Sequence, residues 1–350
     1  MIDDLLGMNL GLQDSHNLTW KLALVMHGIA PASILETYEA ERKPVADAII
    51  KMTARLLEVG LAQDFVRRLI RSAIFTIAPY IIPYLTASKN PVTMLTIRYH
   101  ENAINQHSKS QASIAQDFQV GQRARDGQLH VIRKRGIDLA EVEGQVVRLH
   151  ELTVGPGIFH IAVFTSDMFA ASSEPPPAAI KGTETTTAAT LAKDIEEYLA
   201  AWRSKWTYKS SNEIARSSGN GQDISPPPSP DFKSPLTSSE AIPYPLRANK
   251  LIMVHVIASD KISAKPNDAN GTHPEVVSDA DPLITKQPGD GKIYLDQQGV
   301  LHQKYGIQAN KGPGTIVVIR PDSHIGYRVL GASKSAWDDV SQYLDSILIN

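Results

Sequence analysis

The chain has 350 residues, of which 42% are hydrophobic and 21% charged, and its formal net charge at pH 7 is -2. This length and composition predict two globular domains and exclude wholesale disorder. The near-neutral charge gives no general reason to expect nucleic acid or an acidic membrane surface as a partner. The absence of cysteine excludes disulfides, thiolate metal sites, cysteine nucleophiles and CxxC redox pairs, and it fits a reducing, cytoplasmic location.

The sequence predicts neither a secretory leader nor a membrane span. Asp3 and Asp4 stand where a leader would carry basic residues. The most apolar stretch, residues 73–85, contains Pro79 and Pro83 and is far shorter than the ~20 residues that cross a bilayer. We therefore expect a buried helix or helix pair there.

Residues 1–86 are expected to be helical. One face of the first helix has the apolar spacing i, i+4, i+7 and i+8, formed by Leu18, Leu22, Val25 and Met26. Gly28 is placed to end this helix, and Pro31 forbids its continuation. The spacing predicts that the apolar face packs against a partner surface.

A second helix is expected to begin at Ser33. Ser33 and Glu36 match the S-x-x-E capping box, and Pro44 predicts a kink or restart. An apolar stripe then extends to Gly60, formed by Val45, Ala48, Ile49, Met52, Leu56 and Val59. We expect this chain to carry only part of the surface that these helices need.

The later sequence changes to a pattern of short strands and helices. Residues 92–99 are strand-like, and the polar residues 101–125 are expected to connect two domains. Further strands are expected at 157–165, 251–258, 292–296 with its continuation at 300–303, 314–320 and 325–330, and helices at 191–206 and 335–348. The order β-α-β followed by β-β-α predicts a mixed sheet with helices on its faces. Three segments low in apolar residues, 171–190, 209–245 and 260–290, are expected to be surface inserts.

The most informative motif is Gly7-Met-Asn-Leu-Gly-Leu-Gln-Asp-Ser-His-Asn-Leu-Thr-Trp-Lys-Leu22. It predicts a flexible glycine loop that leads into a helix N-terminus, where free N–H groups and the helix dipole favour an anion or an electron-rich ring edge. The string closely resembles the G-M-N-x-G-x-x-D-x-x-N-L-x-W-K-L signature of the aromatic-ring flavoprotein hydroxylases of the phenol 2-monooxygenase type. Residues 35–45 resemble the next helix of that family. The resemblance implies that the backbone of Gly7, Met8 and Asn9 faces the pyrimidine edge of the FAD isoalloxazine.

The second half of the chain resembles the C-terminal domain of the phenol hydroxylases. The matching segments are 155–164, 305–307 and 319–327. In that family the domain is thioredoxin-like, lacks a redox disulfide and contributes to dimer contacts. Ser166 and Asp167 stand where a true thioredoxin has its cysteines. The resemblance thus implies an α/β fold in which the helical remainder of a hydroxylase core, residues 1–120, precedes a thioredoxin-like dimerisation domain, residues 121–350.

The chain also departs from the family. It contains no G-x-G-x-x-G, the motif whose backbone cradles the FAD pyrophosphate, and Met1-Ile-Asp-Asp-Leu-Leu6 replaces the Gly-Asp element before the flavin loop. Residues that position the aromatic substrate lie upstream in the family, so none can be carried over.

The resemblance implies a monooxygenase that uses FAD, NAD(P)H and O₂ on an aromatic small molecule, and the isolated chain is predicted to be inactive. Three hypotheses remain open. The chain is part of a truncated or split enzyme, a dimerisation or interaction module without turnover, or a thioredoxin-like binding protein of another kind.

Other motifs give no functional prediction. Residues 326–333 have P-loop glycine spacing, but Ala332 replaces the lysine. His150 and Glu151 begin like a zinc HExxH, but Val154 replaces the second histidine. The eleven histidines are scattered and are expected to be solvated or hydrogen-bonded. A small basic cluster is expected to be a solvated helix face: Arg67, Arg68 and Arg71.

Overall fold

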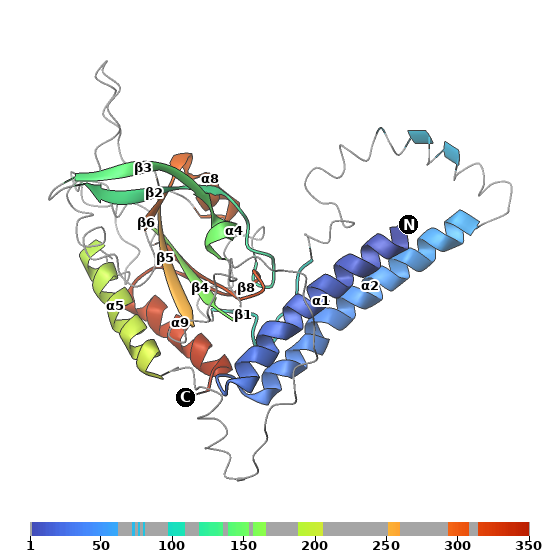
Figure 1. The fold of residues 1–350 in the computed structure, drawn as a ribbon, viewed down its shortest axis with the longest axis horizontal. Coiled ribbons are helices and arrows are strands. Elements are labelled where there is room, and N and C mark those ends of the chain that lie inside the picture. Colours follow the sequence, from blue (N-terminus) through green and yellow to red (C-terminus); the bar gives the residue numbers. More distant parts are fainter. Residues whose placement is uncertain are drawn as a thin grey trace, which may run out of the picture.

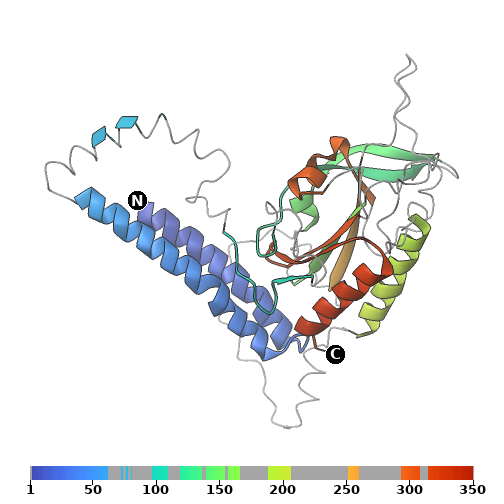
Figure 2. The same ribbon diagram turned by 180° about the vertical axis from the view of Figure 1, so that it is seen from behind.

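The computed structural model of the chain describes residues 2–61, 72–73, 76–77, 80, 97–108, 119–135, 139–153, 157–165, 188–205, 251–259, 293–307 and 314–349. These residues form a long helical hairpin and an eight-stranded mixed sheet with helices on its faces (Figure 1). Figure 2 shows from behind that the closed end of the hairpin lies beside the sheet, whereas the opposite end projects away from it.

The hairpin consists of α1 (Ile2–Met26) and α2 (Glu36–Leu61), joined by the 3-10 turn η1 (Ala32–Leu35). Gly28 ends the first helix as predicted, with a left-handed φ of 65° that favours glycine. The capping-box prediction is wrong, because Pro31 occupies the N-cap and Ser33 lies inside η1. Of the kink or restart expected at Pro44, the restart does not occur, because α2 continues through this residue.

The predicted buried face of α1 is also wrong in part. The side chain of Met26 is 71% exposed, and Leu22 is exposed as well. The face that is buried carries Asn17, Trp20, Lys21 and Leu24. Apolar spacing alone misses this face because two of its members are polar and are buried against charged partners from other segments.

The sheet has the strand order β1-β8-β7-β4-β5-β6-β2-β3. Its strands are β1 (Gln106–His107), β2 (Gln128–Arg135), β3 (Leu139–Arg148), β4 (Phe159–Thr165), β5 (Ile252–Ser259), β6 (Ile293–Asp296), β7 (Thr315–Ile319) and β8 (Ile325–Leu330). The pairs β4–β5, β5–β6 and β1–β8 are parallel, and the other neighbours are antiparallel. The sheet is therefore mixed, as predicted.

The predicted β-α-β and β-β-α units are present. The first is β4, α5 (Ala188–Lys205) and β5, and the second is β7, β8 and α9 (Lys334–Ile347). The two helices lie side by side on one face, where Trp202 of α5 and Trp337 of α9 have ring centroids 6.2 Å apart (Figures 1 and 2). The same core continues into the hairpin, because the Trp20 ring meets Phe159 of β4 edge-on at 5.8 Å.

The opposite face of the sheet carries a second core. The short helices α4 (Leu149–Leu152) and α8 (Val300–Lys304) contribute to it, with Leu149 and Leu301 fully buried beside Tyr305. The prediction that 300–303 continues a strand is wrong. The Asp296 carboxylate accepts hydrogen bonds from the backbone N–H groups of Leu301 at 3.0 Å and His302 at 2.7 Å, and these contacts begin a helix instead.

The hairpin of β2 and β3 was not predicted. Neither was the structural role of residues 101–108, which are more than a connection: they include β1 and the fully buried Asn105. Of the strand expected at 92–99, only residues 97–99 are described, and Arg98 forms an isolated bridge to Gln122.

Several predictions fall on segments outside the described residues. These segments are the inserts at 209–245 and 260–290, most of 171–190, Ser166–Asp167 and the basic cluster near residue 67. Across the described helices, no segment is both long and apolar enough to cross a bilayer.

Candidate functional site

The three residues expected to face a flavin lie near the projecting end of α1. Gly7 and Met8 are exposed, Met8 by 61%, and Asn9 is half-buried. The expected glycine loop is not formed, because α1 is a continuous helix from Ile2. Glycine weakens a helix by about 1 kcal/mol relative to alanine but does not forbid it. The leucines on both sides of Gly7 are good helix formers and favour the helix.

The helical conformation has a consequence for the backbone donors of Gly7, Met8 and Asn9. Inside an α-helix each N–H group bonds to the carbonyl four residues earlier, so only the first turn has free donors. The donors expected to meet a flavin are therefore used within α1. A flavin contact through these amides stays a prediction, and it requires a helix that begins after Gly7.

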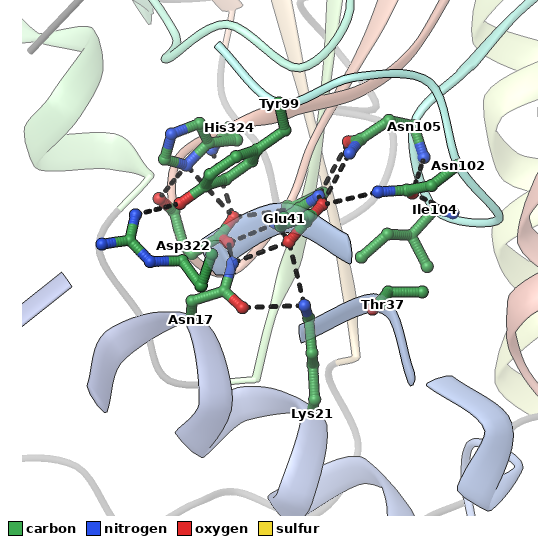
Figure 3. Close-up of polar contacts among 12 residues, drawn as sticks. Asn17, Lys21, Thr37, Glu41, Tyr99, Asn102, Ile104, Asn105, Asp322 and His324 are labelled. Carbon is green, nitrogen blue, oxygen red and sulfur yellow. Dashed lines mark hydrogen bonds and ion pairs between the residues drawn. The ribbon is translucent and has the colours of Figure 1, made fainter. Parts of the chain in front are cut away.

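A cluster of buried polar side chains surrounds Glu41 of α2 (Figure 3). Glu41 Oε1 accepts hydrogen bonds from Arg320 Nη1, from Asn105 Nδ2 at 2.6 Å and from Asn102 Nδ2 at 3.2 Å. Glu41 Oε2 accepts from Asn17 Nδ2 at 2.7 Å, from Lys21 Nζ at 2.9 Å and from Arg320 Nη2 at 3.1 Å. We call these six residues with Asp322 the Glu41 cluster.

Arg320 follows β7 and is fully buried. Its guanidinium bonds to both oxygens of Asp322, with Nε 3.0 Å from Oδ1, and donates to Asn105 Oδ1 at 2.7 Å. The guanidinium carbon lies 5.4 Å from the ring centroid of Trp20 and 5.5 Å from that of Tyr99. Its donors are thus directed at two carboxylates and one amide oxygen, and aromatic rings cover it.

The charges of the Glu41 cluster balance, with two cations (Lys21 and Arg320) and two anions (Glu41 and Asp322). Burial opposes the charged form of Glu41, but Arg320 and Lys21 outweigh it and hold the pKa of Glu41 at about 2. Burial lowers the pKa of Lys21 to about 8 despite its pairing with Glu41. The two cations beside Glu41 both stabilise its charged form and outweigh the effect of burial. For Lys21, the positive charge of Arg320 acts in the same direction as burial and lowers the pKa further.

A second ion pair joins the two helices nearer the projecting end. Arg42 Nε lies 2.5 Å from Asp14 Oδ1, and Arg42 Nη1 donates to Tyr99 Oη at 3.1 Å. Arg42 is almost fully buried, and Asp14 is partly exposed. This contact fixes α1 to α2 only five residues beyond Asn9.

A small solvent-open hollow lies beside the Glu41 cluster. Asn17 and Asp322 line it together with Tyr99, Arg123 and His324. The hollow therefore brings solvent close to the buried carboxylates.

The sequence assigned no role to the Glu41 cluster. Several of its members occur within segments quoted for family resemblance, but no motif relates residue 41 to residue 320. One signal was available: Arg320 and Asp322 closely follow an apolar strand, where a charged residue needs a partner.

Histidines form no metal site in the described residues, where no group of three or more potential metal-ligating residues occurs. His150 bonds to the carbonyl of Ala124 at 2.7 Å. His160 and His255 are both buried, and their rings share one hydrogen bond of 3.1 Å between His160 Nδ1 and His255 Nε2. Burial lowers their pKa values to about 3 and about 4, so both are neutral at pH 7.

Two family models match the chain. Residues 5–53 match a FAD binding domain, and residues 244–350 match the phenol hydroxylase C-terminal dimerisation domain.

Curated relatives match over short segments. A rifampicin monooxygenase of Rhodococcus hoagii is 48% identical over 67 residues, which are 18% of this chain and 14% of the relative. A putative polyketide hydroxylase of Streptomyces halstedii is 60% identical over 42 residues, 12% of this chain and 8% of the relative. The pentachlorophenol 4-monooxygenase of Sphingobium chlorophenolicum is 45% identical over 53 residues, 15% of this chain and 10% of the relative.

Two solved flavin enzymes align with most of the chain. The flavin-dependent monooxygenase PieE, in complex with FAD and substrate, has a TM-score of 0.46 and 16% identity. The alignment covers 97% of this chain and 45% of PieE. Aklavinone-11 hydroxylase, with FAD and aklavinone, has a TM-score of 0.43 and 15% identity over 98% of this chain and 40% of its own.

The chain thus spans less than half of these solved enzymes, and its aligned segments span 14% or less of the curated relatives named above. The two family models match its first helices and its C-terminal domain in the order that the sequence predicted. The resemblance of this chain to the FAD-dependent aromatic hydroxylases of the phenol hydroxylase type is confirmed.

Proposed function

We propose that the chain is part of a FAD-dependent monooxygenase that hydroxylates an aromatic, phenol-like compound with NAD(P)H and O₂. The observation that carries the proposal is the occurrence of a FAD binding match and a phenol hydroxylase dimerisation match in one chain. The names of the relatives, which include a pentachlorophenol monooxygenase and a polyketide hydroxylase, support an aromatic substrate.

FAD would supply the oxygen chemistry when bound, and the protein would supply position and electrostatics. Gly7, Met8 and Asn9 are the residues of this chain that we propose to contact the flavin edge. They do not make a complete cofactor site, because the sequence has no G-x-G-x-x-G and their amides lie inside α1. The 350 residues alone are therefore expected not to turn over.

We further propose that residues 121–350 form a thioredoxin-like domain through which the chain makes a homodimer in the cytoplasm. The neighbouring strands β5-β4-β7-β8, with α5 and α9 on one face, support the thioredoxin-like assignment. The dimerisation match over residues 244–350 supports the homodimer.

The alternative is a non-catalytic dimerisation or interaction protein. It is favoured by the contrast between the well-packed sheet and the lack of a pyrophosphate-binding motif in the sequence.

Purification of the full chain tests these proposals. We expect a colourless homodimer by light scattering that does not oxidise NADH or NADPH in the presence of simple phenols. Stoichiometric bound flavin would overturn the proposal of an incomplete cofactor site, and a monomer would overturn the dimer.

Co-expression with the G-x-G-x-x-G-containing segment of a relative separates the two functions. An enzyme part is expected to yield a yellow complex that contains both chains, with the segment expressed alone as control. Failure to form any complex favours the non-catalytic alternative.

A further inference from the structure

We propose that the Glu41 cluster is a carboxylate-binding site that the chain fills with its own Glu41, and that the filled site locks the helical hairpin onto the sheet. Within the described residues, Glu41 is the member contributed by α2, and the donors come from other segments. The proposal concerns contacts inside this chain and does not depend on flavin binding.

The donor set is complete for a carboxylate. Each Glu41 oxygen accepts three hydrogen bonds, and Arg320 contributes one to each oxygen. Such forked arginine recognition matches the planar geometry of a carboxylate. The two cations and three amides thus surround Glu41 as they would surround a bound ligand.

The cationic donors are held in place without help from Glu41. Asp322 and Asn105 Oδ1 fix the guanidinium of Arg320. Lys21 Nζ donates to Asn17 Oδ1 at 2.8 Å. Removal of the Glu41 side chain is therefore expected to leave both cations near their present positions.

The amide donors are held in the same way. Asn102 Oδ1 accepts from the backbone N–H groups of Ile104 at 2.9 Å and Asn105 at 3.1 Å, which fixes its side-chain direction. Asn17 Nδ2 also donates to Asp322 Oδ2 at 3.2 Å. The site is thus preorganised for a carboxylate, and Glu41 behaves as an intramolecular ligand.

The charge of the site favours an anion. Without Glu41 the cluster keeps Lys21 and Arg320 against Asp322 alone, so while Lys21 is protonated one buried positive charge lacks a counter-ion. The solvent-open hollow meets the cluster at Asn17 and Asp322, and we expect a small anion to enter from this side. Acetate has the same heavy atoms that the substitution Glu41→Ala removes, a carboxylate and one further carbon, so it is the matching probe.

The lock follows from where the donors lie. The Glu41 carboxylate joins α2 to α1 through Lys21, to the segment 97–108 through Asn105 and to the end of β7 through Arg320, 279 residues away in sequence. Loss of this ligand is expected to loosen the closed end of the hairpin.

The test uses the full chain with Glu41→Ala and with the near-isosteric control Glu41→Gln. Thermal unfolding is followed in sodium acetate and in sodium chloride of equal ionic strength. We expect Glu41→Ala to lower the unfolding midpoint by about 10 °C, and acetate to restore much of it in a saturable manner. Acetate should not shift the wild type or Glu41→Gln, because their sites are filled, and neutral acetamide should not rescue Glu41→Ala.

Amide hydrogen exchange measures directly how firmly the hairpin is held against the sheet. In Glu41→Ala, amides of residues 17–24 and 36–45 should exchange faster, and acetate should slow them again. Equal effects of acetate, chloride and acetamide overturn the carboxylate site. If Glu41→Ala does not fold in chloride, the proposal requires that it folds in acetate. A Glu41→Ala variant that stays unfolded in acetate, while Glu41→Gln is folded, also overturns the proposal.

Discussion

The two ends of the helical hairpin contrast sharply. At the closed end, Trp20 and Leu24 are buried against the sheet, and Lys21 is buried in the Glu41 cluster. At the projecting end, Met8 is exposed and Leu12 is 64% exposed. The motif of residues 7–22 thus spans both ends: its first residues are the less packed ones, whereas Asn17, Trp20 and Lys21 near its other end are buried. One sequence motif therefore combines residues that we propose to face a flavin with residues that hold the hairpin against the sheet.

The largest expected effect is at the closed end. Arg320→Ala should lower the free energy of unfolding by about 3–5 kcal/mol, because it leaves Glu41 and Asp322 buried without their main counter-ion. Urea unfolding measures this. Arg148→Ala is the matched control: Arg148 pairs with Asp126 at the surface, and its loss should cost less than about 1 kcal/mol. Equal losses in the two variants would remove the contrast between buried and exposed pairs.

The pH dependence of stability tests the burial of Lys21 at the closed end of the hairpin. The pKa of Lys21 is about 8 in the folded chain, against 10.5 for an ordinary lysine, so the unfolded chain binds more protons between these values. Stability should therefore rise from pH 8 to pH 10.5, by on the order of 3 kcal/mol from this group. The difference between wild type and Lys21→Met isolates the contribution. A difference that is constant over this range contradicts the assignment.

At the acid side the sign is reversed. The pKa of Glu41 is depressed from 4.5 to about 2, so its contribution is complete above pH 4.5 and is lost as the pH falls towards 2. Acid unfolding of Glu41→Gln should lack this loss, measured as a shallower slope of unfolding free energy against pH.

A glycine pair tests the helical state of the flavin motif. Neither Gly7 nor Gly28 has an atom within 4 Å of an added Cβ, but only Gly28 has a left-handed φ. Gly7→Ala should stabilise its part of α1 by about 0.5–1 kcal/mol, and Gly28→Ala should cost about 1 kcal/mol. Amide exchange and urea unfolding measure both. Destabilisation by Gly7→Ala would mean that the predicted glycine loop forms after all.

The smallest effect is expected at the exposed apolar face. Leu12→Ala should change the free energy of unfolding by less than about 0.5 kcal/mol. The same substitution at the buried Leu24 should cost about 2–5 kcal/mol. A large cost at Leu12 in urea unfolding would show that the projecting end is packed in solution.

Continuous apolar runs made much of the sheet predictable. The strands β4, β5, β7 and β8 and the helices α5 and α9 lie where apolar runs and helical spacing placed them. The hairpin β2–β3 was not predicted because its residues mix charges with apolar residues. The helix α8 was not predicted because the Asp296 carboxylate, and not local propensity, begins it.

The Glu41 cluster could not be predicted because its contacts are non-local. Lys21 and Asn17 look like solvent-facing positions of an amphipathic helix, and only a carboxylate from α2 and an arginine from beyond β7 make their burial favourable. The conformation of residues 7–9 was mispredicted for the opposite reason. The glycines of the motif predict a loop, but the local helix propensity of the residues around them is sufficient for a helix.

The distance in sequence between Glu41 and Arg320 has a consequence for biosynthesis. At ~5–20 residues per second, a ribosome adds Arg320 roughly 15–55 s after Glu41. During that interval the nascent hairpin carries Glu41 and Lys21 without the guanidinium that completes their burial. A premature stop codon before residue 320 would make this waiting state permanent, and cellular quality control should treat such a product as unfolded.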